Sequence, residues 1–397
     1  MEDNGNITCE YSEQLLIEWK MVFVGVFGLS TALLSILHNC LLYYSFVSSR
    51  VLRKRKLTYL KWISLCDVFV SLSYIAIMCV QVYVDYFHSL FLFYMWHTYL
   101  VVAFTVSHIT FSSSSYLLMA ATIERYLHST SNTRSTALFH CLRKHRGLVV
   151  FFCFLAGTIL RGTVFFEIEI EHEPRCSDFS SMWATMADLT SYPLLDFIWK
   201  FWIRKLLTVF LPFAVLAYFN ARIVLNVRKT DQDQTVKTLI LYVTVGPRGE
   251  AARLSSRLRT VTRMLVLIVC TYLLSNLIDV LIAIWENVDP QSLLAFPEAY
   301  TVLSDVSSFL PILACALRLP IYCLNDANIA KEVRNSLCNI CGCKHGRELG
   351  REFMPVQAIV SDKDSIEARF GMGSLIMARV KIERSERKSS DESSVLV

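Results

Sequence analysis

Seven apolar stretches alternate with polar, charged loops along the 397 residues of the chain. They lie at residues 21–48, 58–84, 90–123, 147–168, 201–227, 261–285 and 299–324. A helix of about 20 apolar residues crosses the hydrocarbon core of a bilayer, so each stretch is long enough to span it. The pattern predicts an all-α membrane protein with a seven-transmembrane helix bundle over residues 21–325. We expect an N-terminal segment at 1–20, a short amphipathic eighth helix within 326–343 and a polar tail at 344–397.

Composition and charge agree with this picture and orient it. Apolar residues make up 54% of the chain and charged residues 18%, which is more apolar than soluble domains usually are. Basic residues gather in the loops after the first, third and fifth stretches, whereas acids gather at residues 2–18 and 167–173. Because cytoplasmic loops carry the excess of Lys and Arg, we expect the N-terminus outside and the C-terminus inside, at the plasma membrane. The net charge of +5 is then a topology signal and predicts no nucleic-acid partner.

Two further signals concern the N-terminal region. Asn6 begins an Asn-Ile-Thr triplet, which is a glycosylation sequon on the expected outer side. The first apolar stretch is long and free of charge, so we expect it to be a retained span and not a cleaved signal peptide.

Single charges inside the apolar stretches predict buried pairs. Asp67 is the only formal charge in the middle of the second stretch, and Arg318 lies near the inner end of the last. A charge at bilayer depth costs about 2.5–3.5 kcal/mol on insertion scales, so each should face protein. We therefore predict an ion pair between Asp67 and Arg318. The alternative is that Arg318 extends to the cytoplasmic rim by snorkelling.

The third stretch ends in Glu124-Arg125-Tyr126, which resembles the Asp/Glu-Arg-Tyr motif of rhodopsin-like (class A) G-protein-coupled receptors. Further similar positions are Asn39 in the first stretch, Asp67 in the second, Pro212 in the fifth, and Tyr322 before a polar, basic segment. The resemblance covers about residues 20 to 340. Phe165-Phe166-Glu167 and Asn276 are most similar to invertebrate FMRFamide-type neuropeptide receptors.

The chain also departs from the family pattern. Ser275-Asn276-Leu277-Ile278 stands where Cys-Trp-x-Pro is usual, and Arg318-Leu319-Pro320-Ile321-Tyr322 replaces Asn-Pro-x-x-Tyr. Leu100 occupies the place of the outer cysteine of segment three. The resemblance implies a signalling switch made of Glu124, Arg125, Tyr126, Asp67, Arg318, Tyr322 and Asn276. Family members usually bind sodium beside the segment-two aspartate, and we expect Arg318 to take that place here.

The outer half predicts the kind of ligand. Ser107 replaces the aspartate with which aminergic receptors bind an ammonium, and residues 299–324 contain no lysine for a retinal Schiff base. In residues 167–173 acids alternate with isoleucines, so a strand would carry four carboxylates on one face. Such a face favours a cationic peptide, although a charged strand edge that prevents aggregation is equally compatible.

Asp279 is the strongest candidate for a pocket acid, because acids inside transmembrane segments are usually functional. The structural alternative pairs it with Arg204 or Lys205. The candidate ligand-binding residues are Asp279, Arg204, Ser107, His108, Phe111, Gln81, Ser304, Ser308, Glu169 and Glu171.

The C-terminal region carries candidate modification sites. Cys338, Cys341 and Cys343 are juxtamembrane cysteines suited to palmitoylation, and their spacing is too tight for a zinc finger. Serines at 389–394 flank acids, so their phosphorylation would build a patch suited to arrestin. A Cys9–Cys176 disulfide is compatible with the expected outer side.

These observations predict a receptor for a short basic neuropeptide, with or without a C-terminal amide, that signals through a heterotrimeric G-protein. The alternatives are a chemosensory receptor for a small molecule and, from another class, a membrane transporter or channel. Transporters often contain repeated halves with Gly- or Pro-broken helices, and no such repeat is visible. No G-x-S-x-G motif occurs, and we expect no enzyme activity, cofactor or metal.

Overall fold

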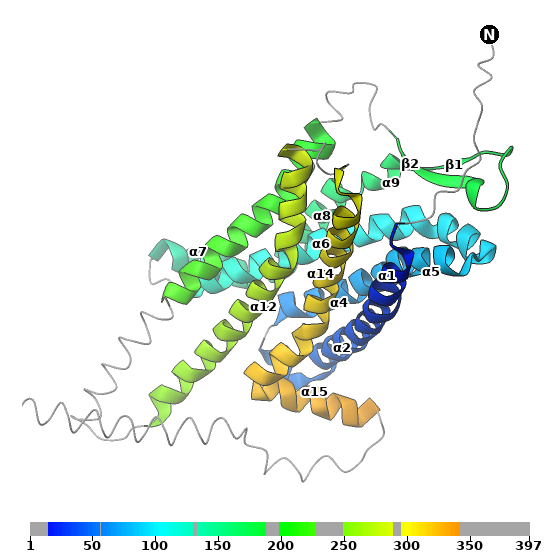
Figure 1. The fold of residues 1–397 in the computed structure, drawn as a ribbon. Coiled ribbons are helices and arrows are strands. Elements are labelled where there is room, and N and C mark those ends of the chain that lie inside the picture. The colour runs from blue at the N-terminus through cyan, green and yellow to red at the C-terminus, as the bar shows by residue number, and fades with distance from the viewer. Residues whose placement is uncertain are drawn as a thin grey trace, which may run out of the picture. The chain divides into compact units, whose positions relative to one another are not determined.

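The computed structural model describes residues 15–55, 57–129, 133–187, 198–226, 249–288 and 295–340 (Figure 1). The chain forms two compact units, Met1–Ser336 and Leu337–Val397, and every contact discussed below lies within the first. Asn6, Cys9, Cys341, Cys343 and the serines at 389–394 lie outside the described residues.

Helices dominate the described part of the chain. The first long helical segment comprises α1 (Ile17–Lys20), η1 (Met21–Gly28) and α2 (Leu29–Ser48), and the second comprises α4 (Thr58–Tyr74), η2 (Ile75–Cys79) and α5 (Val80–Phe87). They are followed by α6 (Leu90–Ser129), α7 (Thr133–Lys144), α8 (Arg146–Arg161) and α9 (Val164–Glu167). The later elements are η4 (Ile198–Ile203), η5 (Leu206–Phe210), α12 (Gly249–Val288), α14 (Pro297–Asn325) and α15 (Ala327–Ile340). Short α3 (Arg50–Lys54) lies between α2 and α4.

Six of the described helices are long and apolar enough to cross a membrane. They are Ile17–Ser48, Thr58–Phe87, Leu90–Leu127, Arg146–Glu167, Leu206–Asn226 and Pro297–Asn325. Within α12 the apolar stretch is shorter, at Val266–Ile282. This content is consistent with an all-α membrane protein, while the count of seven crossings and the orientation stay predictions.

The helices pack around shared buried faces. Helix α4 contacts α2 on one side and α6 on the other, α6 also contacts α8, and α14 contacts both α2 and α12. Leu42, Ile63, Leu117 and Val269 from four of these helices are buried in one core cluster together with Tyr322. Large apolar side chains elsewhere are exposed, for example Phe91 at 75% and Leu274 at 69%. In a bilayer such side chains face lipid at no cost.

A π-helical turn, η2, lies within the second segment, between α4 and α5, and contacts α6. The wider turn disturbs the regular ladder of backbone hydrogen bonds, so carbonyl groups need other donors. Two aromatic side chains of α6 supply them: Tyr99 Oη donates to the carbonyl of Ala76 at 2.9 Å, and Trp96 Nε1 donates to that of Ile77 at 3.1 Å. The turn is therefore anchored to the neighbouring helix.

Helix α15 is held beside the loop that follows α2. Asp326 accepts at Oδ1 from the backbone N–H of Asn328 at 3.0 Å, which caps the start of the helix. Its Oδ2 lies 2.5 Å from Nη1 of Arg55, and Ser49 Oγ donates to Oε2 of Glu332 at 2.7 Å. The buried Ile329 then joins the core. The predicted segment at 326–343 thus begins as a helix whose residues up to Ser336 belong to the first unit.

The acidic segment at residues 167–173 contains strand β1 (Ile168–His172), which forms an antiparallel hairpin with β2 (Met182–Met186). Glu169 lies opposite Thr185, and Glu171 lies opposite Trp183. The predicted strand is correct, but its predicted face of four carboxylates is wrong. Glu167 lies in α9 and is buried, and Glu173 follows the strand, where hydrogen bonds from Arg175 lower its pKa. Only Glu169 and Glu171 remain exposed on that face.

Candidate functional site

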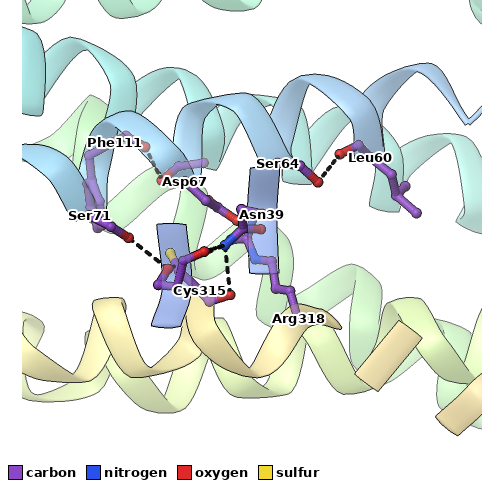
Figure 2. A network of polar contacts seen from close by, with 10 residues as sticks. Asn39, Leu60, Ser64, Asp67, Ser71, Phe111, Cys315 and Arg318 are labelled. Atoms are coloured by element: carbon purple, nitrogen blue, oxygen red, sulfur yellow. Dashed lines mark hydrogen bonds and ion pairs between the residues drawn. The ribbon is translucent and has the colours of Figure 1, made fainter. Parts of the chain in front are cut away.

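The centre of the candidate site is a buried ion pair between α4 and α14 (Figure 2). Arg318 Nη1 lies 2.5 Å from Asp67 Oδ2, and the two side chains are 5% and 1% exposed. The predicted pairing is confirmed as geometry. The alternative in which Arg318 extends to the rim is wrong, because its side chain is buried.

Helix α2 contacts α14 beside this site, at the turn that Pro320 interrupts. Proline has no N–H, so the carbonyl four residues earlier, that of Ala316, loses its partner within α14. His38 Nδ1 lies 2.8 Å from this carbonyl oxygen, which can only accept, so the nitrogen must carry the proton. The next residue, Asn39, donates through Nδ2 to the carbonyl of Cys315 at 3.1 Å. Two adjacent residues of α2 therefore bind the interrupted turn of α14.

The same face of α2 also contacts α4. Ser35 Oγ and Ser71 Oγ lie 2.7 Å apart, and Asn39 Nδ2 donates to the Ser35 carbonyl at 2.9 Å (Figure 2). All three side chains are buried. A polar chain thus links α14, α2 and α4 next to the ion pair.

A small cavity borders the ion pair on its other side. Phe111 and Ser114 of α6 line it together with Tyr272 and Ser275 of α12. It offers about 20 Å³ to the centre of a water molecule, which is enough space for about one water. Phe111, predicted to touch ligand, therefore lies at the inner ion pair. Among the described residues, no cluster of three His, Cys, Asp or Glu side chains could hold a metal ion.

Helix α12 contacts α6 and α14 through a row of polar side chains. Tyr272 Oη lies 2.6 Å from Ser115 Oγ of α6. Asn276 donates to the carbonyl of Tyr272 in its own helix at 2.7 Å. One turn further, Asp279 Oδ1 accepts a hydrogen bond from Ser307 of α14. The acid predicted for the pocket thus joins α12 to α14.

The alternative partner of Asp279, Arg204, is engaged elsewhere. Arg204 Nη1 lies 2.6 Å from both carboxylate oxygens of Glu167. Close by, Arg161 at the end of α8 donates through Nη2 to Oγ1 of Thr208 at 2.8 Å. His108 interacts electrostatically with both arginines. We call these four ionisable residues, Arg161, Glu167, Arg204 and His108, the arginine cluster.

Sequence reasoning placed His108 and Arg204 in the ligand site but missed Arg161 and Glu167. A signal was present, because Arg161 interrupts the fourth apolar stretch and a charge there should have a partner. The remaining candidates do not gather at one point. Gln81, Ser107 and Ser304 are half-buried, and Ser308 donates to the Asp305 carbonyl of its own helix.

The Glu-Arg-Tyr motif lies at the end of α6, where its three members differ in their contacts. Arg146 donates through Nε to Glu124 Oε2 at 2.9 Å, and through Nη2 to the other oxygen. The Tyr126 ring lies 4.9 Å from that of Phe219. Within the described ranges Arg125 forms no ion pair. Tyr322, the last member of the predicted switch, is buried against Phe46.

Cysteine chemistry is limited in the described part of the chain. Cys176 is disulfide-bonded, and the other described cysteines, Cys338 included, are free thiols. Cys9, with which a disulfide is compatible in the sequence, lies outside the described residues. No protein-family model and no curated protein matches this chain.

Proposed function

We propose that this protein is a rhodopsin-like G-protein-coupled receptor whose seven transmembrane helices hold the N-terminus outside the plasma membrane and the C-terminus in the cytoplasm. Its agonist is a short basic neuropeptide, and its cytoplasmic face activates a heterotrimeric G-protein. In this proposal α15 is the amphipathic eighth helix, and Cys338, Cys341 and Cys343 carry palmitate. Arrestin binds the tail after its serines are phosphorylated.

The observation that carries the proposal is the state of Glu124-Arg125-Tyr126 at the end of the third long helix. Glu124 is occupied by Arg146 of α8, so Arg125 is left without an acid among the described residues. A guanidinium held by its helix but not paired can form hydrogen bonds to an incoming partner. This is the property that a coupling site for a G-protein requires.

The buried network supports a signalling role over a transport role. Asp67, Arg318, Asn39 and Ser71 connect three helices, and the cavity beside the ion pair has space for about one water. A continuous polar path is needed for transport, whereas a closed polar joint suits helices that shift between two packings. The guanidinium of Arg318 lies 2.5 Å from Asp67, the residue that by resemblance would bind sodium, so we propose that this receptor signals independently of sodium.

The hairpin and α12 supply the proposed ligand contacts. Glu169 and Glu171 are exposed on one face of β1, which attracts a cationic peptide during approach. Asp279 lies deeper and is held by Ser307 of α14. An arginine of the ligand that competes with Ser307 for this carboxylate would act on α12 and α14 together, which gives binding a route to the helices.

The test is expression of the full chain in cells that report G-protein-dependent cyclic nucleotide or calcium changes. A neuropeptide library is applied, with amidated basic peptides first. We expect at least one peptide to evoke a response that Arg125→Ala abolishes while binding of the labelled peptide persists. A response to small odorant-like molecules alone would favour a chemosensory receptor. Substrate flux without any G-protein response would replace the proposal with a transporter.

A further inference from the structure

The arginine cluster carries more positive than negative charge. Thr208 connects the two arginines, because its hydroxyl also donates to the backbone carbonyl of Arg204 at 2.8 Å, and Glu167 pairs with Arg204 through both oxygens. The hydroxyl of Thr208, a neutral group, accepts from Arg161. Among the described residues Arg161 forms no ion pair, so the described part of the cluster carries two guanidinium charges against the single carboxylate of Glu167.

Partial burial makes this imbalance costly, because Arg161 and Arg204 are both half-buried. The Nε atoms of Arg161 and Arg204 are both shielded from solvent and lack a hydrogen-bond partner among the described residues. Glu167 is 5% exposed and its pairing with Arg204 already uses both of its oxygens. A charge withdrawn from water without a counter-ion is strongly unfavourable. An anion supplied from outside the chain would remove this cost.

We infer that the arginine cluster binds a carboxylate of the ligand, with Arg161 as its primary partner and Arg204 beside it. Guanidinium groups bind carboxylates through two parallel hydrogen bonds, and Thr208 holds Arg161 in position for such a contact. This inference rests on the proposed function for the source of the carboxylate, and it assigns the agonist an acidic group in addition to its basic one.

The position of the cluster fits a ligand with charges of both signs. The backbone N–H of Ala187, the residue after β2, donates to the carbonyl of Glu167 at 2.8 Å. The base of the hairpin is therefore in direct contact with the arginine cluster. Glu169 follows two residues along β1 and is exposed, roughly 7 Å away at the rise of a strand. A peptide could place a cationic group at Glu169 while its carboxylate reaches Arg161.

Two sources offer this carboxylate, namely a free C-terminus and an acidic side chain. Three small probes separate them: N-acetylalanine carries a terminal carboxylate, N-acetylaspartic acid α-amide carries a side-chain carboxylate, and N-acetylalaninamide is neutral. Thermal unfolding of the purified full chain in lipid nanodiscs is measured with each probe at equal ionic strength. The melting temperature does not depend on signalling. The carboxylate site can therefore be rejected while the proposed receptor function stands, and the receptor function can be rejected while the site stands.

We expect at least one carboxylate probe to raise the melting temperature by roughly 2–4 °C at several times its Kd, and the neutral amide to have no effect. Arg161→Gln should lose this shift. The matched control, Arg175→Gln, removes an exposed arginine that is paired with Glu173 and should keep it. Equal shifts with all three probes, or no shift with any, would overturn the inference.

A second variant, Glu167→Gln, keeps the inference testable if Arg161→Gln does not fold. It deprives Arg204 of its partner, so it should lower the melting temperature of the unliganded chain while enlarging the shift produced by the carboxylate probe. A purely structural Glu167–Arg204 pair would lower the melting temperature without any rescue by the probe, and that result would also overturn the inference.

Discussion

Arg146 at the start of α8 binds both carboxylate oxygens of Glu124 at the end of α6. Their side chains are 14% and 5% exposed, so the pair is largely shielded from water and joins two helices. Among the described residues Glu124 forms its ion pair with Arg146 and not with its neighbour in sequence, Arg125. The acid of the motif therefore restrains α8 and not the arginine that we propose to contact the G-protein.

Arg146→Gln should lower ligand-independent signalling. Without Arg146, Glu124 is free to pair with Arg125, and a surface-type pair of about 1 kcal/mol would reduce the signalling state roughly fivefold. Basal G-protein activity normalised to surface expression measures this effect. Glu124→Gln serves as the comparison, because it removes the acid and should not reduce basal activity; equal reduction by both variants would contradict the idea.

Asp67→Ala and Arg318→Ala should each destabilise the protein by about 3–5 kcal/mol, because either change leaves a buried charge without its partner. A double variant that combines Asp67→Asn with Arg318→Gln removes both charges together and should recover a large part of that loss. Thermal unfolding of purified protein and surface expression both measure the loss of stability and its recovery. If the effects of Asp67→Asn and Arg318→Gln, each measured alone, simply add in this double variant, the residues are not coupled.

Signalling of the unchanged chain should not respond to replacement of sodium by N-methylglucamine. The physical reason is that Arg318 Nη1 already lies 2.5 Å from Asp67, so a cation would have to displace a guanidinium. Agonist competition curves in the two salts at equal ionic strength make the measurement. A sodium-dependent change in agonist affinity that Asp67→Asn abolishes would argue against the ion pair as a replacement for the metal.

His38→Ala should destabilise the protein by about 1–3 kcal/mol, because the buried carbonyl of Ala316 then has no donor. Pro320→Ala restores an N–H four residues after that carbonyl, so the His38→Ala change should cost much less in a Pro320→Ala background. The double-mutant cycle is measured by thermal unfolding. A cost of His38→Ala that is the same in both backgrounds would show that His38 contributes by packing alone.

Asp279→Asn should weaken agonist potency by roughly tenfold or more if it is a counter-ion for an arginine of the peptide, since a charged pair at a desolvated site contributes several times more than a rim pair. Ser307→Ala is the matched control: it removes the hydrogen bond between α12 and α14 but retains the carboxylate. Concentration–response curves with the peptide and with its Arg→citrulline analogue are compared. A similar loss for both variants with both peptides would assign Asp279 a structural role.

The elements of this protein follow largely from local patterns that can be counted along the chain. Apolar runs of bilayer length predicted the helices, and alternation at period two predicted β1. Asp67 and Arg318 could be paired in advance because an isolated charge in such a run must face protein and few charges were available to meet it. These are properties of each segment by itself, set by desolvation and by the geometry of helix and strand.

Which partner each side chain chooses was decided only by the packed helices. Glu124 has Arg125 next to it in sequence, yet α8 places Arg146 on the face toward which its carboxylate points. Glu167 continues the period of the hairpin, yet α9 ends there and turns it toward Arg204. His38 meets a carbonyl freed by Pro320, across 278 residues of sequence separation. The sequence states that a charge or a carbonyl needs a partner, but the direction of a side chain around its helix axis, and the neighbour met there, depend on how the helices lie against one another.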